Sequence, residues 1–107
     1  MELNQYAIVL VNFDPTVGSE IKKTRPCVVV SPNEINKYLK TITVVPMTTS
    51  QKKYPTRVGV CYNNTSGMIA IDQIRTIDKS RVLKILGVLS KSETQNCKSV
   101  IKETFVD

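Results

Sequence analysis

Short runs of apolar, mostly β-branched residues alternate with polar turn residues along most of the chain, and this pattern is typical of β-strands. Proline, asparagine or aspartate follows several of these runs, as expected where a strand ends in a turn. Pro26 should be the first residue of its strand, because proline has no N–H to donate within a sheet. The expected strands are residues 6–13, 26–31, 41–45, 57–62 and a fifth that starts at 68–71 and continues through Ile74 and Ile77.

Two further segments complete the pattern. Residues 82–89 form a short apolar run that fits either a strand or a helical turn, and we favour a strand. Ser90 followed three residues later by Glu93 is a capping box, which marks the start of a helix. Apolar residues then recur at helical spacing, at Cys97, Val100, Ile101 and Phe105. One amphipathic helix is therefore expected after the strands.

Several short strands without alternating helices favour a small antiparallel barrel over a parallel α/β sheet. A chain of 107 residues is long enough for one hydrophobic core, and we expect a single domain over residues 1–107. The longest apolar run, Ala7–Val11, is far shorter than the roughly 20 residues that a membrane span requires. The first residues do not resemble a secretory signal, so we expect a cytoplasmic protein that does not enter a membrane.

The chain contains no histidine, which removes the commonest proton shuttle and the commonest metal ligand. Its three cysteines, Cys27, Cys61 and Cys97, form no C-x-x-C pair, and their odd number cannot close a disulfide framework. We expect three reduced, largely buried thiols, no metal site and no cofactor.

Positive charge is concentrated in the middle of the chain. The net charge is +6, and residues 19–57 account for it with eight basic side chains against two acidic ones. Such a cluster is most often a solvated surface, but it also fits a polyanionic partner such as a nucleic acid. Charge alone does not separate these two interpretations.

Four segments carry a more specific signal: NFDPTVGSE at residues 12–20, TRPCVVVSP at 24–32, VPMTT at 45–49, and AIDQIRTIDK at 70–79. Together and in this order they resemble the MazF/PemK family of toxin endoribonucleases. The resemblance spans residues 8–89, and the C-terminal helix agrees with the family in placement but not in sequence. It implies a mainly β fold with a C-terminal helix, an SH3-like barrel of the CcdB/PemK type.

The resemblance also implies a function. Members of this family act as homodimers that cut single-stranded RNA at specific sequences without a metal. A cognate antitoxin keeps such a toxin silent. An antitoxin that covers a basic groove would do so with an acidic, disordered tail, and we expect an acidic antitoxin of the MazE/PemI kind.

RNA can be cut without metal when the ribose 2′-hydroxyl attacks the adjacent phosphorus, and the site must then move protons and stabilise a developing dianion. Arg25 suits the second task, because its planar guanidinium binds two phosphate oxygens at once. Thr48 matches the family's first threonine at this strand end and would orient a phosphate or 2′-oxygen; an ordinary strand-end threonine is the alternative. Glu20 would accept the proton or hold Arg25, or only compensate nearby lysines.

Six further residues are candidates for RNA binding. Lys52, Lys53 and Arg57 would contact phosphates, which adds affinity but little sequence information. Tyr54 would stack on an unpaired base or pack on the barrel rim, and Gln73 would read a base edge or hydrogen-bond inside the protein. Thr49 replaces Thr48 if the register differs by one residue. The loops at residues 17–25 and 48–57 are expected to set the cleavage motif.

Two other functions fit a small barrel. A binding module without catalysis is the first, since such barrels commonly bind without reacting. The second is a gyrase poison like the CcdB branch of the fold, which the ribonuclease-type motifs and the C-terminal residues Phe105–Asp107 disfavour.

Overall fold

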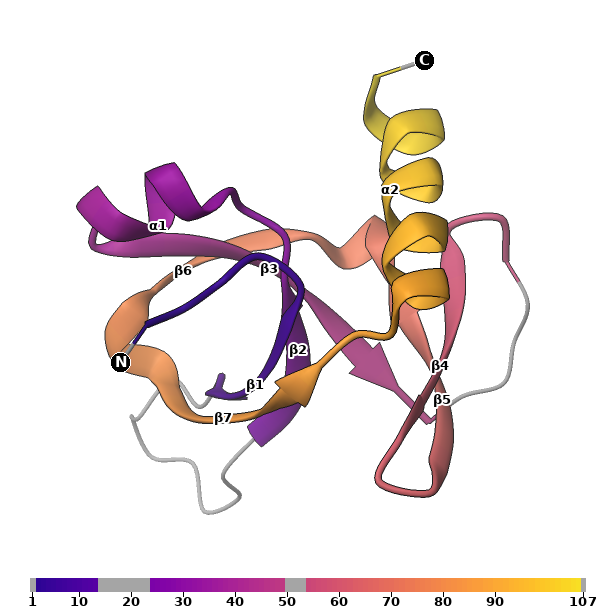
Figure 1. Cartoon of the computed structure of the whole chain (residues 1–107), viewed down its shortest axis with the longest axis horizontal. Coiled ribbons are helices and arrows are strands. Elements are labelled where there is room, and N and C mark those ends of the chain that lie inside the picture. The colour runs from indigo at the N-terminus through magenta and orange to yellow at the C-terminus, as the bar shows by residue number, and fades with distance from the viewer. Residues whose placement is uncertain (1, 14–23, 50–53, 107) are drawn as a thin grey trace.

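A computed structural model of the chain describes residues 2–13, 24–49 and 54–106, and shows a curled β-sheet flanked by helices (Figure 1). Apolar β-branched runs form the strands, as the alternating pattern predicts. The strands are β1 (Ala7–Asn12), β2 (Thr24–Val29), β3 (Thr41–Thr48), β4 (Arg57–Tyr62), β5 (Thr65–Ala70), β6 (Arg75–Asp78) and β7 (Val82–Val88). The helices are α1 (Asn33–Tyr38) and α2 (Lys91–Phe105), with short 3₁₀ turns η1 (Ile71–Gln73) and η2 (Lys79–Arg81).

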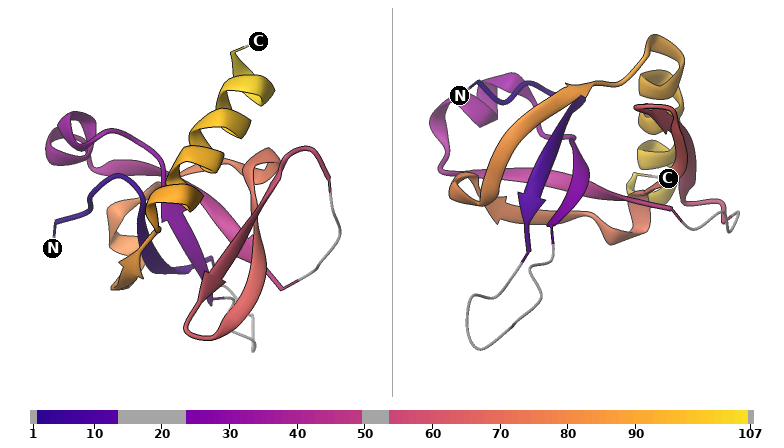
Figure 2. Two further views of the ribbon diagram at one scale, coloured as in Figure 1. Left: turned by 45° about the vertical axis from the view of Figure 1, so that its right-hand side comes forward. Right: turned by 90° about the horizontal axis from the view of Figure 1, so that it is seen from below.

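The seven strands form one antiparallel sheet in the order β4-β5-β3-β2-β1-β7, and β6 pairs with β3. Along one edge β3 pairs with β2, and along its other edge it pairs first with β6 and then with β5. This branching lets the sheet curl into a half-barrel, with the β4–β5 hairpin projecting from it beside α2 (Figures 1 and 2). The predicted small antiparallel barrel with a C-terminal helix is confirmed in this form.

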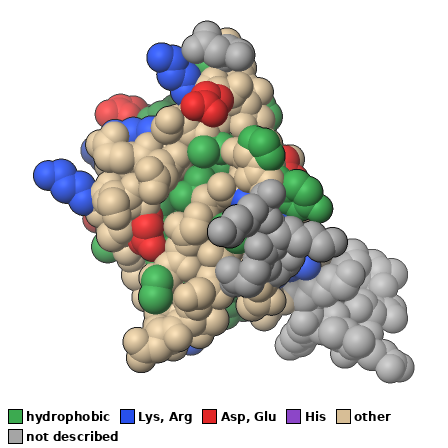
Figure 3. All heavy atoms as spheres, turned by 90° about the vertical axis from the view of Figure 1, so that its right-hand side faces the viewer, with side chains coloured by type: hydrophobic (Ala, Val, Ile, Leu, Met, Phe, Trp, Pro, Cys, Tyr) green, Lys and Arg blue, Asp and Glu red, His purple; other side chains and the backbone are tan. Residues whose placement is uncertain are grey.

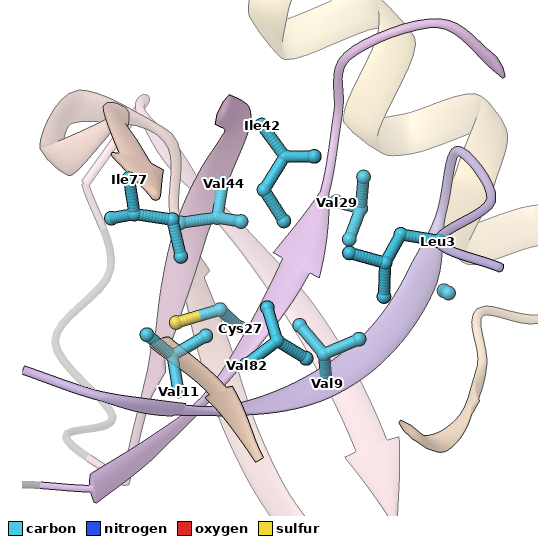
Figure 4. Close-up of a cluster of buried hydrophobic side chains, with 10 residues drawn as sticks. Leu3, Val9, Val11, Cys27, Val29, Ile42, Val44, Ile77 and Val82 are labelled. Atoms are coloured by element: carbon cyan, nitrogen blue, oxygen red, sulfur yellow. The ribbon is translucent and has the colours of Figure 1, made fainter. Parts of the chain in front are cut away.

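Both faces of the central strands are buried, because successive side chains of a strand point to opposite faces. One face of β1, β2 and β3 contributes Val9, Cys27 and Val44 to a cluster inside the curl, where Ile77 of β6 and Val82 of β7 close it (Figure 4). The alternate positions of the same strands pack on the hairpin and α2, in a cluster that holds Ile8, Val28, Val45, Val58, Val60, Ile69, Ile71, Leu89 and Cys97. The central sheet is thus held from two sides.

Helix α2 begins at the predicted capping box. The Ser90 hydroxyl accepts from the Glu93 backbone N–H at 3.2 Å, and Glu93 Oε1 accepts from the Ser90 N–H at 3.0 Å. The other carboxylate oxygen, Oε2, accepts from the Cys61 N–H of β4 at 2.9 Å. One side chain therefore caps the helix and also ties it to the hairpin. Phe105, predicted to lie on the apolar face, is instead exposed at the end of the helix.

Two prolines lie inside strands rather than at their ends, which corrects two sequence predictions. Pro26 is the third residue of β2, where it pairs with Leu10; pairing of β2 with β3 begins only one residue later. Pro46 does not end β3, which continues to Thr48. Neither the pairing with β6, which ends at Val44, nor that with β5, which begins at Met47, includes Pro46. The missing N–H therefore costs no bond to either strand.

The predicted fifth strand is two strands, β5 and β6, separated by η1. The break lets the chain leave the hairpin and pair with the other half of β3, which a continuous strand could not do. The turn between β4 and β5 is tight: Asn63 and Asn64 have positive φ, and β5 begins at Thr65. The run 82–89, for which we favour a strand, forms β7.

The sequence did not predict α1, which follows Pro32. A helix of six residues is too short to display a 3.6-residue period, and Tyr38 is largely exposed. The three thiols are free, but only Cys27 and Cys97 are buried, so the expectation for Cys61 is wrong. Cys61 lies on the outward face of β4, because buried and exposed residues alternate along that strand. In the described part of the chain, no helix has the length and apolar character of a bilayer span.

Candidate active site

The register of β2 and β3 brings the two main catalytic candidates together. Cys27 pairs with Pro46, and Val28 with Val45, in an antiparallel ladder. Continuing the same register by two residues places Arg25 opposite Thr48, beyond the end of the paired segment, and on the same face of the two strands. Residues 23 positions apart in the sequence thus become neighbours at one end of the curled sheet.

Cys27 lies directly behind this position. Burial raises the pKa of its thiol to about 12, although the positive charges of Arg25 and Arg75 act to lower it. The thiol stays protonated at neutral pH and donates to the backbone oxygen of Arg25, with Sγ at 3.7 Å. Cys27 therefore supports the backbone of Arg25 and does not serve as a nucleophile.

Arg75 is a second guanidinium at this end of the sheet, and the sequence analysis did not single it out. It begins β6, pairs with Val44 of β3, and its Cζ lies 4.7 Å from the centre of the Phe13 ring. Its charge and that of Arg25 both act on the Cys27 thiol. Within residues 2–13, 24–49 and 54–106 neither arginine is paired with a carboxylate. Two unpaired guanidiniums around one point favour binding of an anion such as phosphate.

Tyr54 and Arg57 form a separate group with Asp72. The Nε of Arg57 donates to Asp72 Oδ1 at 3.1 Å, and the Thr56 hydroxyl donates to the same oxygen at 2.8 Å. Burial alone would raise the pKa of Asp72, but these hydrogen bonds bring it below its ordinary value. The guanidinium of Arg57 lies over the Tyr54 ring, with Cζ 5.2 Å from the ring centre. Arg57 would contact a phosphate only by sharing or leaving Asp72.

The remaining candidates are distributed as follows. Thr49 is exposed beside Thr48, and Gln73 is exposed at the end of η1, next to Asp72 in the chain. Glu20, Lys52 and Lys53 lie outside the described residues. The structure thus groups Tyr54 with Arg57, and the continued register of β2 and β3 indicates that Arg25 and Thr48 are neighbours. Arg75 lies in the AIDQIRTIDK segment, but no local signal shows that β6 returns to β3 beside Arg25.

Known proteins resemble this chain over most of its length. A family model described as PemK-like, MazF-like toxin of type II toxin-antitoxin system matches residues 4–105. The endoribonuclease toxin MazF of Escherichia coli K12 is 35% identical over 95 residues, which cover 88% of this chain and 86% of that protein. The endoribonuclease MazF of Staphylococcus epidermidis is 33% identical over 92 residues, covering 80% and 77%.

Solved structures show the same fold. A MazE-MazF structure from Deinococcus radiodurans superposes with a TM-score of 0.83 at 24% identity, covering 96% of this chain and 95% of that one. An endoribonuclease in complex with its cognate antitoxin from a mycobacterial species gives a TM-score of 0.80 at 18% identity, covering 94% and 91%.

Proposed function

The chain belongs to the family of PemK-like, MazF-like toxins of type II toxin-antitoxin systems and is an endoribonuclease of that family, and we propose that it cuts single-stranded RNA. Messenger RNA is the favoured substrate in this proposal, and Arg25 and Thr48 lie at the cleaved phosphate. The observation that supports this proposal is the register of β2 and β3, which, continued by two residues beyond the paired segment, would set the Arg25 guanidinium opposite the Thr48 hydroxyl. Both groups act on phosphate oxygens. The nearby charge of Arg75 makes the same place more favourable for an anion.

The proposed reaction is an internal transfer. The 2′-oxygen of the ribose attacks phosphorus, the bond from phosphorus to the 5′-oxygen breaks, and the products are a 2′,3′-cyclic phosphate and a 5′-hydroxyl. The proton of the 2′-hydroxyl leaves to a base, and the departing 5′-oxygen gains one proton. No metal or bound water is required for this step.

Each residue has a distinct role in this proposal. Arg25 donates two N–H groups to the oxygens that gain charge as the phosphorane forms. Thr48 hydrogen-bonds the 2′-oxygen or a phosphate oxygen and thereby positions it for the attack on phosphorus. Glu20 stays the predicted proton acceptor. Lys52 and Lys53 stay predicted phosphate contacts, and Tyr54, held by Arg57, presents a ring on which a base can stack.

The partners follow from the same chemistry. We propose an acidic antitoxin, supported by the solved structures whose toxins are bound to MazE or to a cognate antitoxin. We also propose a homodimer working in the cytoplasm. Exposed apolar residues on β7, at an outer edge of the sheet, support self-association: Leu83, Ile85 and Val88.

Metal-free digestion of a long, unstructured RNA with EDTA present tests the proposal. The wild-type protein should give discrete cuts that end in a cyclic phosphate and a 5′-hydroxyl, and Arg25→Ala should bind RNA but no longer cut it. Lys102→Ala, which removes one positive charge from the exposed face of α2, is the matched control and should cut normally. Absence of cuts by folded wild-type protein, or equal cutting by Arg25→Ala, would refute the proposal.

Binding without cleavage by the wild-type protein would identify the binding module. Inhibition of DNA gyrase would identify the gyrase poison. The relatives found by sequence comparison are endoribonucleases, so neither alternative is favoured.

A further inference from the structure

A shallow pocket of about 100 Å³ lies beside Thr48, between the end of β3, the start of β2 and the β4–β5 hairpin. Its apolar walls come from Pro26, Met47 and Tyr62. Hydroxyl groups and one glycine complete the lining: Thr48, Thr49, Thr65, Ser66 and Gly67. Among the described residues that line it, none carries a charged side chain.

The pocket adjoins the proposed catalytic residues without containing the arginine. Thr48 lines the pocket and also stands opposite Arg25 in the register of β2 and β3. Pro26 follows Arg25 directly, and consecutive side chains of a strand point to opposite faces. A phosphate bound by Arg25 and a ligand group that packs on Pro26 would therefore be close neighbours, on the two sides of one strand. In an RNA chain, the base of an adjoining nucleotide is one such neighbour of a phosphate.

The lining selects a flat, uncharged ligand. Aromatic and apolar walls pack against the face of a ring, and single-stranded RNA is commonly read by such stacking. A hydroxyl both donates and accepts hydrogen bonds, so the Thr65 hydroxyl at the rim can pair with a base edge. The described lining residues offer a phosphate no positive charge. The side of the molecule that carries the hairpin is covered mostly by hydrophobic side chains, uncharged polar side chains and backbone (Figure 3).

Tyr62 is held in place from behind. Its hydroxyl donates to the backbone oxygen of Leu86 at 3.5 Å, so the ring spans from the hairpin to β7. A Cβ at Gly87 would lie 3.7 Å from Tyr62 Cε1, so the ring packs directly over the Gly87 backbone. The ring is partly buried. It offers a fixed surface that needs little ordering when a ligand binds.

We propose that this pocket holds one unpaired nucleobase of the RNA next to the cleaved phosphate, and that the β4–β5 hairpin thereby helps to set the cleavage motif. The inference rests on the proposed function, because the RNA reaches the pocket through the phosphate at Arg25 and Thr48. It adds a specificity element outside the two loops, residues 17–25 and 48–57, to which the sequence analysis assigned the motif.

Two variants and a control test the pocket. Tyr62→Leu removes the flat wall, and Thr65→Val removes a rim hydroxyl while keeping the side-chain shape. Tyr38→Leu changes a tyrosine on α1 that is 81% exposed, and serves as the control. Each protein cuts a random-sequence RNA library, and sequencing of the new 5′ ends gives the base preference at every position around the cut.

Tyr62→Leu should reduce discrimination at one position beside the cut, because a base that no longer stacks on the ring is no longer held against the hydroxyls at the rim. Thr65→Val should change which base is preferred at the same position, and Tyr38→Leu should keep the wild-type pattern. An unchanged pattern in folded Tyr62→Leu and Thr65→Val would overturn the pocket while leaving the ribonuclease standing. Equal loss of discrimination at all positions would also overturn it.

Binding of an RNA oligonucleotide with a 2′-deoxy nucleotide at the cut position gives a readout without cleavage. Tyr62→Leu should weaken this binding about tenfold relative to wild type. Unchanged affinity would overturn the inference. A wild-type protein that neither cuts nor binds this RNA would refute the proposed function, and with it the pocket.

Discussion

Replacement of Gly67 by alanine tests whether the close approach of β5 to β3 holds Thr48 in position. A Cβ at Gly67 would lie 2.7 Å from the backbone oxygen of Thr48, whereas ordinary contacts begin at 3.4 Å. The obstacle is backbone and cannot rotate away, so one of the two strands must shift by several tenths of an ångström. Thr48 pairs with Met68, the residue after Gly67, and the shift therefore falls on the proposed catalytic hydroxyl.

The size of the effect follows from two opposing contributions. Overpacking costs about 1–3 kcal/mol, and alanine recovers about 0.5–1 kcal/mol relative to glycine in a strand. A net loss of about 1 kcal/mol lowers the melting temperature by roughly 4–8 °C in a domain of this size. A misplacement of about 1 Å costs on the order of 100-fold in rate, so a smaller shift should slow cleavage by about tenfold.

Gly59 supplies a matched control in the same hairpin. It is exposed in β4, and a Cβ there meets nothing within 4 Å. Gly59→Ala should raise the free energy of unfolding by about 0.5–1 kcal/mol, the gain of alanine over glycine in a strand, and leave the rate unchanged. The assays are thermal unfolding and the initial rate on a single-site oligonucleotide. Wild-type stability and rate in Gly67→Ala would refute the reasoning, and equal losses in both variants would trace the effect to glycine itself.

Three further outcomes are expected. Glu93→Ala should lower the free energy of unfolding by about 1 kcal/mol, because it removes part of the helix cap and the hydrogen bond to β4. Glu103→Ala, on the exposed face of α2, is the control and should change the free energy of unfolding little. Equal losses in the two variants would contradict the capping argument. Burial acts to raise the pKa of Glu93, but its hydrogen bonds outweigh burial and leave it below its ordinary value. The ionised Glu93 carboxylate therefore stabilises the fold above about pH 4.3, and this stabilisation is lost as the pH falls through the folded-state pKa. In Glu93→Gln the free energy of unfolding, measured against pH, should lack this loss at acid pH. In the folded protein a maleimide should label the exposed Cys61 and spare the two buried thiols, as mass spectrometry would show; labelling that survives Cys61→Ser would contradict the burial of the others. Arg75→Gln should weaken RNA binding and reduce the slope of log affinity against log salt by about 1, and an unchanged slope would remove Arg75 from the phosphate contacts.

The elements that sequence analysis located are those with a local signal. The capping box at Ser90 and Glu93 identified the start of α2, and alternating apolar residues identified the strands. The errors also have local causes. Proline rules misplaced the boundaries near Pro26 and Pro46, because a strand that changes partner can hold a proline where no partner needs its N–H.

The residues of the candidate site divide in the same way, into those with a local sequence signal and those without one. Arg25 and Thr48 were identified through sequence motifs, and the register of β2 and β3, continued by two residues, supports their lying opposite each other. Arg57 was predicted as a phosphate contact, whereas the structure pairs it with Asp72, 15 residues away. Arg75 and the pocket at Tyr62 carried no signal that could be read along the chain.

The sequence by itself determined the strands, the capped helix and the family, because periodicity, capping and motifs act over a few neighbouring residues. Only the tertiary structure decided that Arg75 and Arg25 both lie near the buried Cys27 thiol, and that Pro26, Met47 and Tyr62 line one pocket beside Thr48. These arrangements depend on pairings between strands distant in the chain, chosen by burial on two faces of one sheet. The free energy gained by burial depends on all of these pairings together, and no single segment of the sequence contains that information.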